Sequence, residues 1–260
     1  VRGRADVVTR PRPPARPGPV GTAAAVLGLV TVAGASLLFP IAVMLGRLAE
    51  GSRYGVDWGR LAQAAGSTLA LSAGGALLAV VLAAPVATLA ARHRSRPVAA
   101  VESVSYLGLG LPGIVVGLSL VFFSLAAVPA LYQTAPVLVF AYAVLFLPKA
   151  IGSARAAVER VPPVVEEVAR TLGRRAGQAW LAVTARQAWP GIAAGGLLVM
   201  VTAMKELPAT LMLRPVGVQT LATELWQRTA LGAYGAAAPA ALLLVLLACV
   251  PAWLLAGRQP

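Results

Sequence analysis

A lysine and a glutamate, Lys205 and Glu206, stand side by side inside an otherwise apolar stretch, Val201–Leu213. An ionisable side chain inside a bilayer costs about 2–3 kcal/mol even on a lenient scale, so such residues either serve a transport path or snorkel to the interface. Pro208 removes the N–H that would bond the carbonyl of Met204, which predicts a kinked helix. We expect the freed Met204 oxygen to accept a bond from the Lys205 ammonium, and Glu206 to face a translocation path or outer gate.

Other constellations that perform chemistry are missing from the sequence. His93 is the only histidine and Cys249 the only cysteine, so no Ser-His-Asp set, no His/Cys metal site and no intrachain disulfide can form. There is no G-x-x-x-x-G-K-[ST] loop for ATP. The carboxylate of Glu206 alone, without His, Tyr or Asp neighbours, is no tight site for a hard metal cation. We therefore expect neither an enzyme nor a bound cofactor.

The apolar residues are arranged for a membrane. Of the 260 residues, 58% are hydrophobic and 12% are charged, whereas soluble domains carry about 25% charged residues. The apolar runs are long enough to cross a hydrocarbon core about 30 Å thick. We predict an all-α, polytopic membrane protein with about six spans, in which Gly and other small residues permit close helix packing. The predicted spans are Val20–Gly46, Ala64–Ala91, Leu107–Val128, Leu131–Ile151, Gly191–Leu213 and Ala236–Leu255.

The net charge of +13 indicates how the chain is oriented in the membrane. A nucleic-acid surface would interleave arginines with aromatic or polar contacts on one face, but here the basic residues collect between the apolar runs. With the N-terminus in the cytoplasm, sixteen of the 22 basic residues are cytoplasmic and five lie on the other side. The positive-inside rule therefore predicts that both termini are cytoplasmic, and we expect no nucleic-acid partner. The Arg- and Pro-rich residues Val1–Pro19 predict a disordered tail or linker before a transmembrane domain at 20–260.

The longest cytoplasmic connection, residues 152–190, has helical periodicity. Pro162 and Pro163 suit a helix start, and Gly173 suits its end because glycine adopts the left-handed conformation. A second short helix is predicted at 176–188. The apolar positions of the first helix are Val164, Val165, Val168 and Leu172, and its polar positions are Glu166, Glu167 and Arg170.

Several segments keep two interpretations at this point. The helices of 152–190 either lie along the membrane surface or dock into the groove of a partner and transmit force to the spans. Residues 214–235, on the opposite side, form either an interfacial helix anchored by Trp226 or a docking surface for a substrate-binding protein. Four tyrosines are expected to be interfacial anchors rather than metal ligands, namely Tyr106, Tyr132, Tyr142 and Tyr234.

The stretch EEVARTLGRRAGQAWLAVT, residues 166–184, resembles the EAA loop of importer permeases of the ATP-binding cassette class. That pattern reads E-A-A, three residues, G, nine residues, then I-x-L-P. This sequence differs from it at Val168, which replaces the first alanine, and at Ala185-Arg186, which replace Leu-Pro. The resemblance implies a set of ATPase-coupling residues, namely Glu166, Glu167, Ala169, Gly173 and Val183.

Longer stretches, among them SYLGLGLPGIVVGLSLVFF and KELPATLMLRPVGVQTLATELW, resemble the ferric-iron importer permeases in particular. The resemblance implies a chain in the bacterial inner membrane that receives its cargo from an extracytoplasmic substrate-binding protein and is driven by a cytoplasmic ATPase dimer. It covers the C-terminal half of a two-half permease, so a second permease half, fused, separate or homodimeric, is implied as well. Alternatives are the same machinery with thiamine, a phosphonate or a polyamine as cargo, and an ion-coupled secondary transporter.

Overall fold

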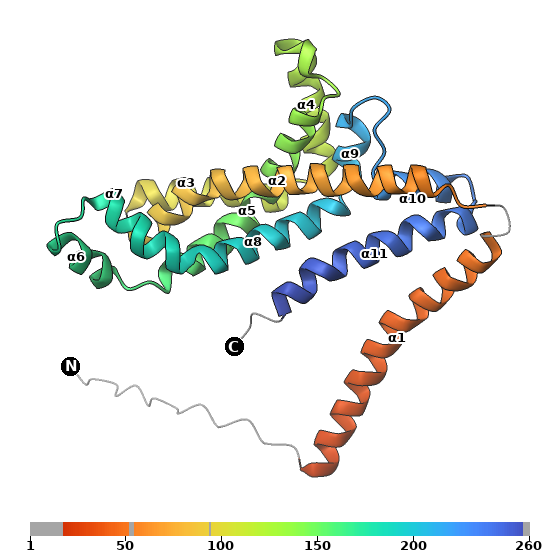
Figure 1. The fold of residues 1–260 in the computed structure, drawn as a ribbon, viewed down its shortest axis with the longest axis horizontal. Coiled ribbons are helices and arrows are strands. Elements are labelled where there is room, and N and C mark those ends of the chain that lie inside the picture. Colours follow the sequence, from red (N-terminus) through yellow and green to blue (C-terminus); the bar gives the residue numbers. More distant parts are fainter. Residues whose placement is uncertain (1–17, 52–54, 94, 257–260) are drawn as a thin grey trace, which may run out of the picture. The chain divides into compact units, whose positions relative to one another are not determined.

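The structure is a computed structural model that describes residues 18–51, 55–93 and 95–256. Within these ranges every regular element is helical, which confirms the all-α prediction (Figure 1). The predicted tail, apart from Gly18 and Pro19, lies outside the described residues. The longer helices are α1 (Pro19–Gly51), α2 (Trp58–Arg92), α4 (Gly113–Ala127), α5 (Ala135–Glu159), α8 (Arg186–Met204) and α11 (Tyr234–Ala256). The shorter ones are α3 (Arg96–Tyr106), α6 (Pro163–Thr171), α7 (Ala176–Ala179), α9 (Pro208–Leu213) and α10 (Leu221–Ala230).

By its internal contacts the chain divides into two units, Val1–Leu45 and Gly46–Pro260. The first unit holds most of α1, an apolar helix of 33 residues. The second unit holds every other helix, and its centre is formed by α2, α5 and α8, which lie side by side (Figure 1). The sites described below all belong to this second unit.

Small residues allow α2, α5 and α8 to approach closely. A Cβ at Gly195 of α8 would collide with the hydroxyl of Ser153 on α5, and a Cβ at Gly75 of α2 would collide with the side chain of Tyr142. A core cluster between these helices consists largely of alanines: Ala76, Ala79, Ala83, Ala143, Ala150, Ile151 and Val199. Without a hydrophobic force between helices in lipid, such close packing is a main source of association. The predicted role of the small residues is confirmed.

The number of spans agrees with the prediction, but two of the predicted spans have different shapes. Five described helices are long and apolar enough to cross a membrane, and the number is six if one bent pair of helices counts as a span. That pair consists of residues 96–110 and 113–127, which meet at 105°, so the predicted single span Leu107–Val128 is wrong. The bend occurs because Pro112 takes an extended conformation as the N-cap of α4, where it can start a helix but not continue one.

The predicted fifth span, Gly191–Leu213, is wrong at both ends. One helical run extends from Ala176 through Pro190 to Met204, so the predicted second helix of the loop is continuous with the span. Packing of Ala188 against Ala157 and Val158 of α5 holds the helix together at this point. This packing outweighs the one backbone hydrogen bond that a proline removes.

Candidate functional site

α6 forms where the sequence predicts a helix. Pro163 occupies its first position, where a missing N–H is not needed. At the other end Gly173 has a φ of 88°, and the N–H of Arg174 bonds to the carbonyl of Ala169 at 3.2 Å. This is a Schellman-type helix end, which needs a left-handed residue. The predicted start at Pro162-Pro163 and end at Gly173 are both confirmed.

The two glutamates of α6 face different surroundings. Glu167 is exposed, whereas Glu166 is half-buried and Ala169 is buried toward the rest of the chain. The exposed side carries three large apolar residues, which we call the α6 stripe: Val164 (57% exposed), Val168 (53%) and Leu172 (80%). The sequence predicts the two-sided pattern, but the structure reveals that the apolar side is the one that points away from the chain.

Glu166 is held by Arg92, the last residue of α2. Nη2 of Arg92 donates to Oε1 of Glu166 at 2.7 Å and to Oγ1 of Thr184 at 3.3 Å, while Nη1 donates to the carbonyl of Val161 at 2.9 Å. The hydroxyl of Thr184 donates to the same carboxylate oxygen. The side chains of Arg92 and Glu166 are only 14% and 22% exposed, so solvent screens this pair less than it screens a surface pair. We call these four residues the Arg92 cluster.

Thr184 reaches the Arg92 cluster from a π-helical segment, Trp180–Ala185, within the long helix that ends in α8. Such segments often mark functional sites in helices. Thr184 is fully buried, and Val183, which stands in the place of the family's isoleucine, is half-buried beside it. The segment ends directly where the sequence has Ala185-Arg186 in place of Leu-Pro.

Two buried N–H donors at this junction have no hydrogen-bond partner within the described part of the chain. They are Nε of Arg92 and Nε1 of Trp180, which lies one helical turn before Thr184. An unpaired buried donor costs about 1–3 kcal/mol. Both N–H groups could therefore donate a hydrogen bond if the residues around the Arg92 cluster were rearranged.

The Lys205-Glu206 pair lies at a helix break rather than at a kink. α8 ends at Met204, and Pro208 is the first residue of α9. The break forms because the carboxylate of Glu206 satisfies the first turn of α9. It accepts from the N–H of Ala209 at 3.2 Å and from the N–H of Thr210 at 3.1 Å. Pro208 therefore begins a second helix instead of bending one.

The two members of the pair have different environments. Lys205 is exposed, and no bond from its ammonium to the Met204 carbonyl is found among the described residues, contrary to the expectation; its backbone N–H bonds to Ala203. Glu206 is half-buried, and its Oε1 lies so close to Gly113 that a Cβ there would collide with it. The carboxylate thus lies at the N-terminal turns of both α4 and α9, where backbone N–H groups favour a negative charge.

Sequence reasoning misplaced Tyr142 of α5. Tyr142 is 2% exposed and its hydroxyl lies 2.7 Å from Oγ1 of Thr210, so its prediction as an interfacial anchor is wrong. Lys149, which lies inside the predicted span Leu131–Ile151, is part of α5, and this helix continues to Glu159. Its ammonium lies 5.3 Å from the ring centroid of Phe146 and 3.5 Å from Oγ1 of Thr202.

The opposite end of α2 carries a second cluster of arginine and glutamate. Glu224 of α10 is 2% exposed. Its Oε2 accepts from Nε and Nη2 of Arg60 at 3.0 and 2.8 Å, and its Oε1 accepts from Nε of Arg228 at 2.9 Å. The N–H of Leu221 also donates to Oγ1 of Thr68 at 2.8 Å, which joins the start of α10 to α2. We call Arg60, Glu224 and Arg228 the Glu224 cluster; no motif in the sequence indicates it.

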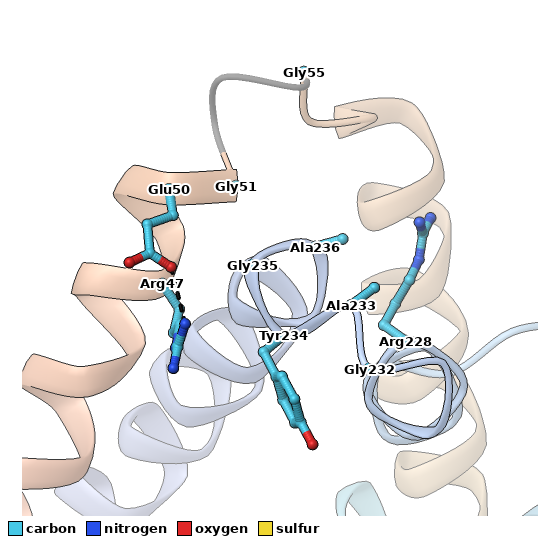
Figure 2. Close-up of a pocket in the computed structure, with 10 residues that line it drawn as sticks. All are labelled: Arg47, Glu50, Gly51, Gly55, Arg228, Gly232, Ala233, Tyr234, Gly235 and Ala236. Atoms are coloured by element: carbon cyan, nitrogen blue, oxygen red, sulfur yellow. Dashed lines mark hydrogen bonds and ion pairs between the residues drawn. The ribbon is translucent and has the colours of Figure 1, made fainter.

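A pocket of about 680 Å³ lies beside the Glu224 cluster. Figure 2 shows Arg228 on one side of it and the ion pair of Arg47 with Glu50, whose atoms lie 3.0 Å apart, on the other. Tyr234 and its neighbours at the start of α11 line the space between them. Trp226 of α10 is half-exposed, so the geometry leaves both interpretations of residues 214–235 open.

Solved structures of ABC transporters share the fold of this chain. Solved structures with this arrangement include a bacterial alginate ABC transporter in complex with an alginate pentasaccharide-bound periplasmic protein. That chain is 17% identical, with a TM-score of 0.64, over 90% of this chain and 92% of its own. The MetNI methionine ABC transporter in inward-facing conformations is also similar, with 17% identity and a TM-score of 0.58, over 77% of this chain and 96% of its own.

Residues 79–256 match the family model for the binding-protein-dependent transport system inner membrane component, and the chain belongs to this family. A relative, the Fe(3+)-transport system permease protein FbpB 2 of Haemophilus influenzae, is 38% identical over 199 residues, which are 76% of this chain and 39% of the relative. The molybdenum transport system permease protein ModB of Mycobacterium tuberculosis is 31% identical over 54% of this chain and 57% of its own length. The chain therefore spans well under two thirds of these relatives.

Proposed function

We propose that this chain is one half of the permease of an ATP-driven importer for ferric iron in the bacterial inner membrane. Its termini lie in the cytoplasm, and a second permease half completes the path. A substrate-binding protein delivers the cargo from outside, and a cytoplasmic ATPase dimer drives transport. The proposal for ferric iron is supported by the 38% identity to a permease named for Fe(3+) transport.

The observation that carries this proposal is the α6 stripe. Val164, Val168 and Leu172 are all more than half exposed on a short helix whose inward side is fixed to α2 through Glu166. An apolar helix face of this kind fits a hydrophobic groove on a partner. We therefore assign residues 152–190 to the ATPase-coupling loop, with Glu167 on the outer, docking side, while Ala169 and Gly173 shape the helix.

Replacement of Leu172 by Asp tests the docking. Burial of a leucine contributes about 1.5–3 kcal/mol, and a loss of about 1.4 kcal/mol weakens binding tenfold. We therefore expect the amount of ATPase subunit that co-purifies with the tagged permease to fall at least tenfold. Leu231→Asp is the matched control, because Leu231 is 82% exposed at the end of α10 and should leave co-purification unchanged. Equal co-purification with both variants would refute docking by the stripe and favour a stripe that rests on lipid.

The cargo is tested by uptake of radioactive Fe3+ and, in parallel, of radioactive molybdate into cells that carry or lack the full permease containing this chain. We expect the permease to be required for Fe3+ and not for molybdate. Permease-dependent uptake of molybdate without uptake of Fe3+ would refute the proposal of ferric iron and favour molybdate, as the name of the ModB relative indicates. Uptake that needs no ATPase subunit would favour a secondary transporter.

We further propose that the break from Met204 to Pro208 forms part of the path or its outer gate. Lys205, exposed in this chain, faces the path, while Glu206 holds α9 in place. Lys205→Met keeps the length of the side chain and removes its charge, so Fe3+ uptake should change severalfold, because intramembrane charges cost about 2–3 kcal/mol and are kept for function. Co-purification of the ATPase should stay the same. Unaltered uptake would contradict a role in the path.

A further inference from the structure

The end of α2 joins three separate parts of the cytoplasmic loop through one side chain. Arg92 contacts the turn before α6 at Val161, α6 itself at Glu166, and the π-helical segment at Thr184. These partners are 69, 74 and 92 residues away along the chain. No other arginine–carboxylate pair among the described residues joins α2 to α6.

The link between α6 and α2 is polar. Val164, Val168 and Leu172 point outward, Val165 is half-buried, and Ala169 is the only fully buried residue of α6 in the described structure. The backbone of α6 lies against α7 and the π-helical segment, whereas its side-chain contact with α2 is the pair of Glu166 and Arg92. A force applied to the stripe can therefore reach α2 directly through Glu166 and Arg92.

The chemistry of the contact requires an arginine. The planar guanidinium presents five donors in a fixed fork. Here Nη1 serves the Val161 carbonyl, and Nη2 serves both the Glu166 carboxylate and the Thr184 hydroxyl. A lysine presents one compact ammonium and cannot hold the three acceptors in the same geometry. The unpaired Nε of Arg92 and Nε1 of Trp180 give the same junction donors for a second arrangement, as an element that moves between two states requires.

We propose that Arg92 is a positioning residue that couples the ATPase-docking loop to the transmembrane bundle. The inference rests on the proposed function of the α6 stripe. When the docked α6 moves, Arg92 transfers the displacement to α2, which packs against both α5 and α8. Glu166 thus acts within the permease, whereas Glu167 faces the partner.

The test uses the full permease in its own membrane, with the co-purified ATPase subunit. Arg92→Ala should keep the ATPase subunit bound and hydrolysing ATP, while Fe3+ uptake per ATP hydrolysed falls about tenfold, the scale of coupling within one hydrogen-bond network. Arg92→Lys should fall between Arg92→Ala and the parent. The matched control is Arg47→Ala, because Arg47 also pairs with a glutamate, Glu50, but both residues belong to α1, outside residues 152–190. It should leave uptake per ATP unchanged.

A charge exchange keeps the inference falsifiable if Arg92→Ala fails to fold. Arg92→Glu alone should lose coupling, and Arg92→Glu combined with Glu166→Arg should recover part of it. Unchanged uptake per ATP in Arg92→Ala, or no recovery in the exchanged pair, would overturn the positioning role. If the parent permease binds no ATPase subunit, the proposed function itself is refuted. Failure of the proposed function can therefore be told apart from failure of the positioning role of Arg92.

Discussion

An arginine at each end of α2 pairs with a glutamate that is largely shielded from water, but the two glutamates differ in burial and in number of partners. At the α10 end, the side chain of Glu224 is 3% exposed and two arginines donate to both of its oxygens. At the α6 end, the side chain of Glu166 is 22% exposed and receives one arginine and one hydroxyl on a single oxygen. The first cluster leaves no buried donor unpaired in the described structure, whereas Arg92 in the second keeps its Nε unpaired.

The comparison indicates which of the two contacts contributes more to stability. A buried charge that has several partners is strongly held, because removal of all of them leaves it uncompensated in a low dielectric. A carboxylate that is 22% exposed and has one ionic partner loses less when that partner is removed, because water can reach it. We infer that α10 is held to α2 more strongly than α6 is.

The largest effect is expected when both arginines of the Glu224 cluster are removed. Arg60→Gln with Arg228→Gln leaves Glu224 buried and unpaired, which costs about 3–5 kcal/mol. Thermal unfolding of the purified permease in detergent should then shift down by roughly 10 °C. Arg92→Gln with Arg155→Gln is the control, because the carboxylates that these arginines contact are 18–45% exposed, against 3% for Glu224. A shift as large in the control as in the test pair would break the comparison.

The smallest effect is expected from Arg228→Gln alone. Arg60 still donates twice to Glu224, and the lost i,i+4 pair involves an arginine that is 36% exposed. Such a pair contributes about 0.3–0.5 kcal/mol, so the melting temperature should drop by only about 1–2 °C. A drop close to that of the double variant would mean that Arg228, rather than Arg60, holds the carboxylate.

The all-α fold and the α6 helix could be predicted because their signals are local. Apolar runs of about 20 residues specify spans, and Pro163 and Gly173 specify the ends of α6 through their own backbone preferences. The interrupted helices were harder. Pro112 and Pro190 are both prolines in apolar runs, yet the first starts a new helix and the second lies inside one. The difference comes from packing around each residue, which a single sequence does not display.

The site was predictable only where it resembles a known loop. The EAA pattern indicates Glu166 and Glu167 together, but which of the two faces the bundle depends on Arg92, 74 residues earlier. Arg92 in the sequence is simply a basic residue at the end of a span. Likewise the pattern around Lys205 and Glu206 marks an unusual place in the membrane, but the capping of α9 by Glu206 depends on a helix break that the sequence suggested only as a kink.

The start of α4 beside the start of α9 has a consequence for hydration. Backbone that leaves a helix within a bilayer needs partners for its polar groups, and ordered water is one of them. Here Glu206 bonds to the N–H groups of Ala209 and Thr210 and lies against Gly113. One carboxylate thus accepts the two hydrogen bonds that water would otherwise accept, so the first turn of α9 needs fewer bound waters.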